Sequence, residues 1–347
     1  MASSKDLPPW DIPFFPNIFV KNQFCTKPQK PPETTDLTGK VAVITGANTG
    51  LGFEASKQML SLNLSHLVIA VRSREKGEAA AAKLRNKHPG ATIEVMLLDM
   101  SSYDSIQGFV HRIDNQLSRL DIAILNAGVM KLNYSTVPNT GHEEMIQINY
   151  LSTALLAILL LPILKSKSPA GGPGRLTIVN AALALTVPLP TTNGHKSLLA
   201  ALDDPKGFVN YSDKQYNLSK VLGHMFAYKL IDYVSADDVI VNLVCPGFVK
   251  GTELSREVNI LVKPIMATFA GIAARSLSDG ASTYLDAALV KGKESHGSFI
   301  MSWKISPYNS FLYTPEGRDA AERLWRETMD ELDPAGVSGI LESMKKL

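Results

Sequence analysis

The sequence predicts an α/β fold, with one doubly wound parallel sheet covered by helices on both faces. Two observations carry this prediction. From Lys40 onward, short apolar runs alternate with segments of helical period, as in sheets whose two faces are buried. The first run, Val41–Ile44, leads into glycines and then into a helical segment, which is the order of a strand, a tight turn and a helix. Nothing in the 347 residues indicates a second domain.

Composition narrows the class of protein. The formal net charge of +2 gives no electrostatic basis for binding nucleic acid or an anionic membrane. The two cysteines, Cys25 and Cys245, allow neither a disulfide framework nor a cysteine zinc site, and they fit a cytoplasmic setting. No histidine has partners at ligand spacing, so we expect no metal. The apolar run Leu151–Leu164, broken at Pro162, is too short to span a bilayer, so we expect a buried helix and no stable membrane insertion.

The alternation of apolar runs and helical periods places each element. Strands are expected at 41–45, 67–71, 92–98, 121–125, 175–180 and 239–244, with a last strand at 297–301. Helices are expected at about 51–62, 75–87, 102–118, 142–165, 213–235 and 265–292, and C-terminal helices at 320–332 and 338–346.

Residues 1–39 form a leader in which prolines alternate with aromatic and aliphatic side chains. A helix cannot pass through these prolines, so we expect the leader to lie extended against the body as a strap and to bury its aromatic residues. A lid, a dimer contact and a membrane contact are the alternative roles.

Three glycines, Gly46, Gly50 and Gly52, separate the first strand from the first helix of the domain. A helix N-terminus offers unpaired N–H groups and about half a positive charge, and glycines let a pyrophosphate approach the backbone. The spacing is G-x-x-x-G-x-G rather than the commoner G-x-G-x-x-G. The segment therefore predicts a dinucleotide site, the alternative being a tight strand–helix connection.

Ligands of such sheets bind at the carboxyl ends of the strands, so the residues that follow each strand are informative. Arg72 and Ser73 follow the second strand, where an arginine suits a 2′-phosphate and a carboxylate would suit a ribose hydroxyl. Asp99 ends the third strand and can accept from an adenine amino group or cap the helix that starts near Ser102. The small residues of 126–128 leave room for a cofactor beside the backbone.

Tyr216 and Lys220 are four residues apart in an expected helix and so share one face of it. A lysine ammonium beside a phenol lowers the phenol's pKa, which makes the tyrosine usable as an acid at neutral pH. Such a pair also arises by chance, but here it follows the glycine-rich turn and Asn126-Ala127-Gly128 in one chain.

Taken together, these motifs resemble those of the short-chain dehydrogenases/reductases over about residues 38–300. Gene-cluster-type fungal reductases of secondary metabolism look most similar, because of the leader, the insert before Tyr216 and the C-terminal extension. The matching segments are Thr45-Gly46-Ala47-Asn48-Thr49-Gly50-Leu51-Gly52, Asp99, Asn126-Ala127-Gly128, Asn149, Tyr216-x-x-x-Lys220 and Cys245-Pro246-Gly247.

The resemblance implies NADPH as the cofactor and assigns residues to each part of it. The pyrophosphate, ribose, 2′-phosphate, adenine and carboxamide would be held by Gly46, Asn48, Thr49, Gly50, Leu51, Gly52, Arg72, Ser73, Asp99, Met100, Asn126, Ala127, Gly128, Pro246, Gly247, Val249 and Thr252. Lys220 would bind the nicotinamide ribose and depress the pKa of Tyr216, which would donate the proton. Asn149 would hold a water that relays protons to Lys220, the alternative being an ordinary amide inside a helix.

The chain departs from the family pattern where a serine normally holds the substrate oxygen after the fifth strand. We place the missing hydroxyl at Ala181, with a slip toward Leu183 as the alternative. Loss of one such donor typically slows the reaction by about a hundred- to a thousandfold. Three explanations are open: a serine-to-alanine substitution introduced to trap a ligand, a natural alanine with Asn180 or Thr186 as another donor, and a natural protein that no longer performs redox chemistry.

Two apolar segments flank the expected site. The insert 183–213 precedes Tyr216, and the family's substrate lid corresponds to 251–275. Apolar walls on both sides predict a hydrophobic carbonyl substrate, the alternative being an ordinary buried helix pair.

We therefore expect a leader over 1–39, a Rossmann-type domain over 40–304 and a C-terminal helical extension over 305–347. The expected function is NADPH-dependent reduction of a ketone on a hydrophobic, natural-product-like compound. The rival is a cofactor-binding protein without redox activity, such as an isomerase or cyclase. The oligomeric state is open between two alternatives. In this family the helix that contains Leu151–Leu164 often packs on a partner subunit, which predicts a homodimer, whereas a leader that covers this helix would leave a monomer.

Overall fold

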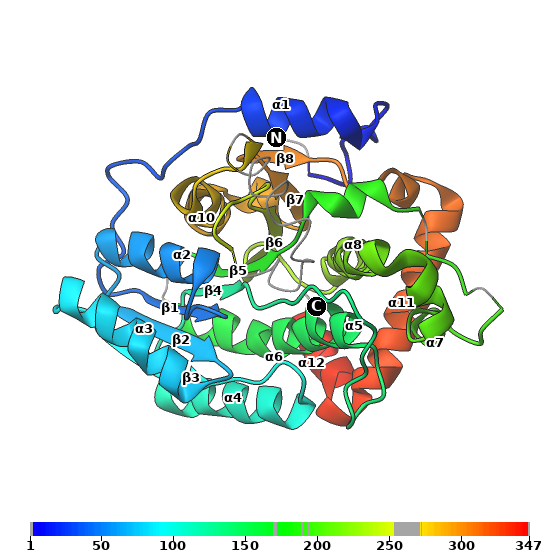
Figure 1. Cartoon of the computed structure of the whole chain (residues 1–347). Helices are drawn as coiled ribbons and strands as arrows, with labels where there is room; N and C mark the ends of the chain where they lie inside the picture. Colours follow the sequence, from blue (N-terminus) through cyan, green and yellow to red (C-terminus); the bar gives the residue numbers. More distant parts are fainter. Residues whose placement is uncertain are drawn as a thin grey trace.

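An eight-stranded sheet lies at the centre of the chain, between two layers of helices (Figure 1). The computed structural model describes residues 3–168, 172–188, 190–192, 194–252, 271 and 273–345, and only the backbone of 209–213. The strands are β1 (Val41–Thr45), β2 (His66–Val71), β3 (Thr92–Leu97), β4 (Ile122–Leu125), β5 (Gly174–Val179), β6 (Val239–Cys245), β7 (Ser298–Met301) and β8 (Lys304–Ser306).

The strand order is β3-β2-β1-β4-β5-β6-β7-β8. Strands β1 to β7 are parallel, and β8 runs antiparallel to β7 as an edge strand. The chain leaves β1 toward β2 and β3 and then returns to β4 on the other side of β1, so β1 and β4 form the switch point at which such sheets bind ligands. The predicted α/β class is confirmed, and the seven predicted strands are right to within one residue at each end.

Two hydrophobic cores fill the space between the sheet and its helical layers. On one face pack α2 (Gly50–Ser61), α3 (Arg74–Lys87) and α10 (Leu277–Leu285), the last of which continues into a π-turn at Asp286–Val290. On the other face pack α4 (Tyr103–Gln116), α6 (Ser152–Lys167) and α8 (Pro205–Leu230).

Short elements complete the framework. Before α6 lie α5 (Glu144–Ile146) and a π-turn at Gln147–Leu151, and α7 (Leu198–Leu202) precedes α8. One-turn 3₁₀ helices lie at Ala182–Thr186, Lys293–Ser295, Ser310–Tyr313 and Asp333–Ala335.

The helix that carries Tyr216 and Lys220 differs from its predicted bounds of 213–235. It begins at Pro205, because Asp204 accepts a hydrogen bond from the Lys206 backbone and proline is favourable in a first helical turn. The predicted helix 265–292 is described only from Leu277 as a regular helix, and most of its earlier part lies outside the described residues.

The apolar helix α6 continues through Pro162, as the predicted helix over 142–165 requires. Together α5, the π-turn and α6 form a helical segment, Glu144–Lys167, that is long and apolar enough to cross a membrane. Its most apolar stretch is 89% buried inside the protein, however, which supports the predicted core helix. The helices α4 and α12 (Val337–Met344) pack against α6 and cover part of its surface within the chain.

The strap is only partly as predicted. A π-turn at Phe14–Ile18, which contains Pro16, and the helix α1 (Phe19–Phe24) replace the expected extended conformation. The helix α1 can form because no proline lies within residues 17–27. Ile18 is buried, but Phe15 and Phe24 are about half exposed, so the prediction that the aromatic residues are buried is wrong for these two. The strap nevertheless lies on the body, above β8 in Figure 1.

The C-terminal extension folds back over the α8 side of the molecule. Its main helix α11 (Pro315–Leu332) packs against α8 and α7. Phe226, near the end of α8, and Tyr233, just beyond it, stack on Trp325 of α11. The extension thus braces the helix that carries Tyr216.

Candidate active site

The glycine-rich turn places the N-terminus of α2 at the switch point. Gly46 and Gly50 adopt positive φ values of 65° and 58°, which favour glycine. A Cβ on Gly52 would lie 2.6 Å from Asn126 Nδ2, so only glycine lets α2 approach β4 this closely. Thr49 at the start of α2 provides no side-chain cap, whereas serines cap α3, α4 and α10. The first N–H groups of α2 are therefore available to an anion.

The segment Asn126–Gly128, directly after β4, is held against this turn. Thr45 Oγ1 accepts the backbone N–H groups of Asn126 and Ala127 at 2.9 Å each. The Asn126 amide donates to the Thr45 carbonyl at 2.9 Å and accepts from the Tyr284 hydroxyl at 3.0 Å. Sequence reasoning missed Tyr284, which lies 158 residues away on α10.

Three predicted adenosine-side residues lie at the ends of β2 and β3. Arg72 is exposed and forms no hydrogen bond or ion pair with the described part of the chain, while Ser73 caps α3 by accepting from the Lys76 backbone. The Asp99 carboxylate accepts from the backbone and hydroxyl of Ser101 at 3.0 and 2.7 Å. Ser102 is the residue that caps α4, so the alternative of Asp99 as the helix cap is wrong.

Tyr216 lies in a small apolar cluster of its own. It is 6% exposed, and its fully buried neighbours in the cluster are Met145 and Phe208. Partly buried residues surround these three, namely Val129, Met130, Tyr134, Ala181 and Leu183. The fold therefore brings both candidate positions for the missing serine, 181 and 183, to the tyrosine.

Lys220 is buried one turn after Tyr216. Its Nζ lies 5.6 Å from the centre of the Tyr216 ring and donates to the Val179 carbonyl at the end of β5 at 3.2 Å. Burial lowers the pKa of Lys220 to about 8. Burial, with the nearby Cys245, raises the pKa of Tyr216. The direction is therefore opposite to the predicted depression of the Tyr216 pKa, because burial disfavours the charged phenolate.

Asn149 lies in the π-turn before α6, an irregularity that is frequent at functional sites. Its Oδ1 accepts from Val129 N–H and its Nδ2 donates to the Val129 carbonyl, both at 2.8 Å. Nδ2 also donates to Ser219 Oγ at 3.0 Å, so Asn149 links the loop after β4 to α8. A Cβ on Gly128 would lie 3.1 Å from Asn149 Oδ1 and 3.8 Å from Lys220 Nζ, which places all three together.

The residues considered as replacements for the serine hydroxyl are engaged elsewhere. Asn180 is buried, donates to the Lys220 carbonyl at 3.0 Å and accepts from Ala181 N–H at 2.6 Å. The Thr186 hydroxyl donates to the Leu183 carbonyl at 2.7 Å. One Asn180 N–H and the Thr186 hydroxyl proton are thus already used within the chain, and a substitute donor from this pair stays a prediction.

The loop after β6 contains the predicted seat of the carboxamide. Cys245 Sγ accepts N–H groups from Ala182 and Gly247 at 3.1 and 3.3 Å, which ties this loop to the end of β5. Farther along the loop, Val249 packs against Gly280 of α10. A Cβ added to Gly280 would lie 2.7 Å from Val249 and 2.8 Å from Leu51 of α2. The close packing of α10 thus connects the loop to the glycine-rich turn.

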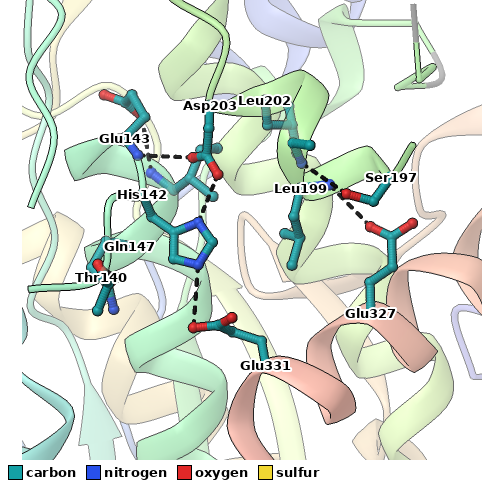
Figure 2. A network of polar contacts seen from close by, with 12 residues as sticks. Thr140, His142, Glu143, Gln147, Ser197, Leu199, Leu202, Asp203, Glu327 and Glu331 are labelled. Carbon is teal, nitrogen blue, oxygen red and sulfur yellow. Dashed lines mark hydrogen bonds and ion pairs between the residues drawn. The ribbon is translucent and has the colours of Figure 1, made fainter. Parts of the chain in front are cut away.

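A partly buried polar network holds the insert before Tyr216 (Figure 2). His142 lies between Asp203 at the end of α7 and Glu331 on α11, at 2.7 and 3.2 Å. Glu327 of α11 accepts the backbone N–H groups of Leu198 and Leu199, both at 3.0 Å, at the start of α7. The C-terminal extension therefore holds the insert in place.

The charge on His142 follows from these contacts. Burial opposes protonation, but the hydrogen bonds to Asp203 and Glu331 outweigh it and raise the pKa of His142 to about 9. The imidazolium form is therefore the one that bridges the two carboxylates at neutral pH.

Two further expectations concern the lid and metals. Most of the predicted lid 251–275 lies outside the described residues, so its contacts with the site are not described. In the part of the chain that the structure covers, no three His, Cys, Asp or Glu side chains are grouped for a metal.

Comparisons with known proteins agree with this geometry. A family model described as short chain dehydrogenase matches residues 40–185. The short chain dehydrogenase/reductase mfmJ of Annulohypoxylon moriforme is 60% identical over 345 residues, 99% of both chains. The short chain dehydrogenase virL of Hypocrea virens is 44% identical over 94% of this chain and 95% of its own. The NADPH-dependent 3-quinuclidinone reductase of Rhodotorula rubra has the same fold, with a TM-score of 0.56 and 21% identity over 80% of this chain and 96% of that one.

Proposed function

Because the chain belongs to the short-chain dehydrogenase/reductase family, we propose that it uses NADPH to reduce a ketone on a hydrophobic, natural-product-like substrate. The observation that carries this proposal is the grouping of Tyr216, Lys220 and Asn149 beside the switch point of the sheet. The exposed Cys25 and the buried Cys245 are both unpaired, which fits a reaction in the cytoplasm.

The residues present fit a dinucleotide. The uncapped N-terminus of α2 suits a pyrophosphate, and the space around Gly50, where no atom lies within 4 Å of an added Cβ, is open to it. The carboxamide end is assigned to the loop Pro246–Thr252, and the adenine to Asp99 and Met100. The small residues of Asn126–Gly128 would leave room for the cofactor to lie beside the backbone.

The choice of NADPH over NADH depends on the end of β2. Arg72 forms no hydrogen bond or ion pair with the described residues. No carboxylate directly follows the strand to accept from a ribose 2′-hydroxyl. A guanidinium beside the start of α3 is the pattern that a 2′-phosphate requires. The fungal 3-quinuclidinone reductase of the same fold is described as NADPH-dependent, which supports this choice.

When bound, the cofactor supplies the hydride that reaches the carbonyl carbon. Tyr216 then donates its hydroxyl proton to the carbonyl oxygen. The raised pKa of Tyr216 keeps the phenol protonated before the reaction. Lys220, fixed by the Val179 carbonyl, stabilises the phenolate that remains. Asn149 holds the loop after β4 beside Lys220 and lies where a proton relay to the lysine is needed.

The substrate class follows from the environment of Tyr216. The side chains that border the phenol are apolar or aromatic, and the Tyr134 and Phe208 rings pack edge to face 5.6 Å apart. Tyr134 donates its hydroxyl to the Asp203 carbonyl, which turns its polar end away from the site. Such a wall suits a bulky, apolar carbonyl compound better than a sugar or a small acid.

The alanine at position 181 supports a second candidate function. A site with the cofactor residues and Tyr216 but without the serine hydroxyl also suits a cofactor-binding isomerase or cyclase that performs no net redox reaction. NADPH oxidation with hydrophobic ketones separates the two functions. Oxidation that depends on Tyr216 supports the reductase, whereas NADPH binding without oxidation by the serine-restored protein favours the second candidate.

A further inference from the structure

The strap helix α1 contacts the loop that follows β6. Gln23 Nε2 donates to the Phe248 carbonyl at 2.8 Å, and Phe248 N–H donates to Gln23 Oε1 at 3.3 Å. The side-chain amide thus pairs with both polar groups of one residue, as a neighbouring strand would. The two residues are 225 positions apart, so the N-terminal strap is built into this loop.

A buried arginine joins the same parts of the chain. Arg275, 7% exposed, donates to the Pro246 carbonyl at 3.1 Å and to the Asn22 carbonyl of α1 at 2.5 Å. Its guanidinium also donates to Ser302 Oγ at 2.7 Å and lies 4.7 Å from the centre of the Trp303 ring. Among the described carboxylates none forms an ion pair with it, so its buried donors serve to hold carbonyl groups of the strap and the loop.

The backbone of Arg275 reinforces this arrangement. Its N–H donates to the Phe248 carbonyl at 2.8 Å, and its carbonyl accepts from Lys250 N–H at 3.1 Å. The Phe248 carbonyl therefore accepts from both Gln23 and Arg275. Val249 and Arg275 also form an isolated parallel β-bridge, which joins the end of the loop to Arg275.

The strap helix α1, the loop after β6 and Arg275 meet at Gly247. Its φ is +84°, and an added Cβ would lie 2.7 Å from Arg275 Nη1 and 3.2 Å from Gln23 Oε1. The conformation of Gly247 is thus set by α1 on one side and by Arg275 on the other, rather than by β6 alone.

We propose that Gln23 is a positioning residue for the nicotinamide half of the cofactor site, and that the strap serves as the outer support of loop 246–249. This inference rests on the proposed function, which assigns that loop to the carboxamide. The adenosine half depends on β1, α2 and the end of β2, which Gln23 does not contact. Loss of the Gln23 amide therefore weakens binding of the whole cofactor and spares binding of a fragment that lacks nicotinamide.

The test compares Gln23→Ala with Asn22→Ala in the full chain by calorimetric titration with NADPH and with 2′-phospho-ADP-ribose. The Asn22 side chain contacts Met301 Sδ and not the loop, and its carbonyl is retained in the variant, so it is the matched control. We expect Gln23→Ala to weaken NADPH binding about five- to tenfold and to leave binding of the fragment within about twofold. Asn22→Ala keeps the wild-type affinity for both ligands.

A second variant covers the case in which Gln23→Ala does not fold. Gln23→Glu keeps the length of the side chain and the acceptor for Phe248 N–H, but it faces the Phe248 carbonyl with a carboxylate, and it should show the same selective loss. Equal affinities in wild type and both variants, or an equal weakening for both ligands, would overturn the inference. A wild-type protein that binds neither ligand contradicts the proposed function instead.

Discussion

The Lys220 ammonium lies 5.6 Å from the centre of the Tyr216 ring, one helical turn away on α8, and is anchored on the Val179 carbonyl. This anchor fixes the cation beside the phenol without a direct hydrogen bond to it. Burial disfavours the charged form of each group, raising the pKa of Tyr216 and lowering that of Lys220 to about 8. In the proposed reaction, Tyr216 would therefore hold its proton until charge develops on a bound carbonyl.

Replacement of the acid tests this arrangement. We expect Tyr216→Phe to lower the single-turnover rate of NADPH oxidation by about a hundred- to ten-thousandfold, the usual contribution of a positioned proton donor. The Kd of NADPH should change little, because the phenyl ring remains in the cluster. Tyr228→Phe, three turns farther along the same helix, is the control and should keep the wild-type rate. Unchanged turnover in Tyr216→Phe of the serine-restored protein would exclude Tyr216 as the proton donor.

Cofactor preference is expected to depend on Arg72. Arg72→Ala removes a charge-assisted contact with the 2′-phosphate, so the affinity for NADPH should fall about tenfold or more while that for NADH stays the same. Arg74→Ala provides the control, since Arg74 is also exposed and lies two residues later at the start of α3. Fluorescence titration of both nucleotides measures the ratio. An equal loss for the two nucleotides would place the 2′-phosphate elsewhere.

The ion pairs of His142 make the free energy of unfolding depend on pH. The folded-state pKa is about 9 and the ordinary value is 6.5, so the stabilisation is fully present below about pH 6.5 and is lost as pH rises through 9. We expect the stability difference between wild type and His142→Gln to be on the order of 2 kcal/mol at pH 6 and to shrink toward pH 10.

Urea unfolding at several pH values measures this difference, and His195→Gln is the matched control. His195 pairs with Asp204 in the same insert at 3.1 Å, but its side chain is more exposed than that of His142. A stability difference for His142→Gln that stays constant between pH 6 and pH 10 would show that its charge does not hold the insert.

The strands could be predicted because buried parallel strands are continuous apolar runs between helical periods, as at Val41–Thr45 and Val239–Cys245. The start of α8 was missed because Asp204 and Pro205, its cap and first residue, lie inside an apolar insert with no clear period. The helix α1 was missed because neighbouring prolines suggested an extended chain.

The predicted motif residues of the candidate site could be identified in sequence, but their electrostatics and supports could not. The direction in which the Tyr216 pKa shifts depends on how deeply the phenol is buried in its cluster with Met145 and Phe208. The spacing of residues along the chain does not show this burial. The contacts of Tyr284 with Asn126 and of Gln23 with Phe248 join residues 158 and 225 positions apart. Local patterns cannot show such pairs, since tertiary folding alone brings them together.

We propose that the chain is an NADPH-dependent ketone reductase in which Ala181 occupies the position of the oxyanion donor. The most direct test is single-turnover oxidation of NADPH with a panel of hydrophobic ketones, comparing the chain with its Ala181→Ser variant and with Ala182→Ser as the control. We expect Ala181→Ser to be about a hundredfold faster and Ala182→Ser to show no gain. If all three proteins bind NADPH and none oxidises it with any ketone of the panel, the result contradicts the reductase and favours a non-redox role.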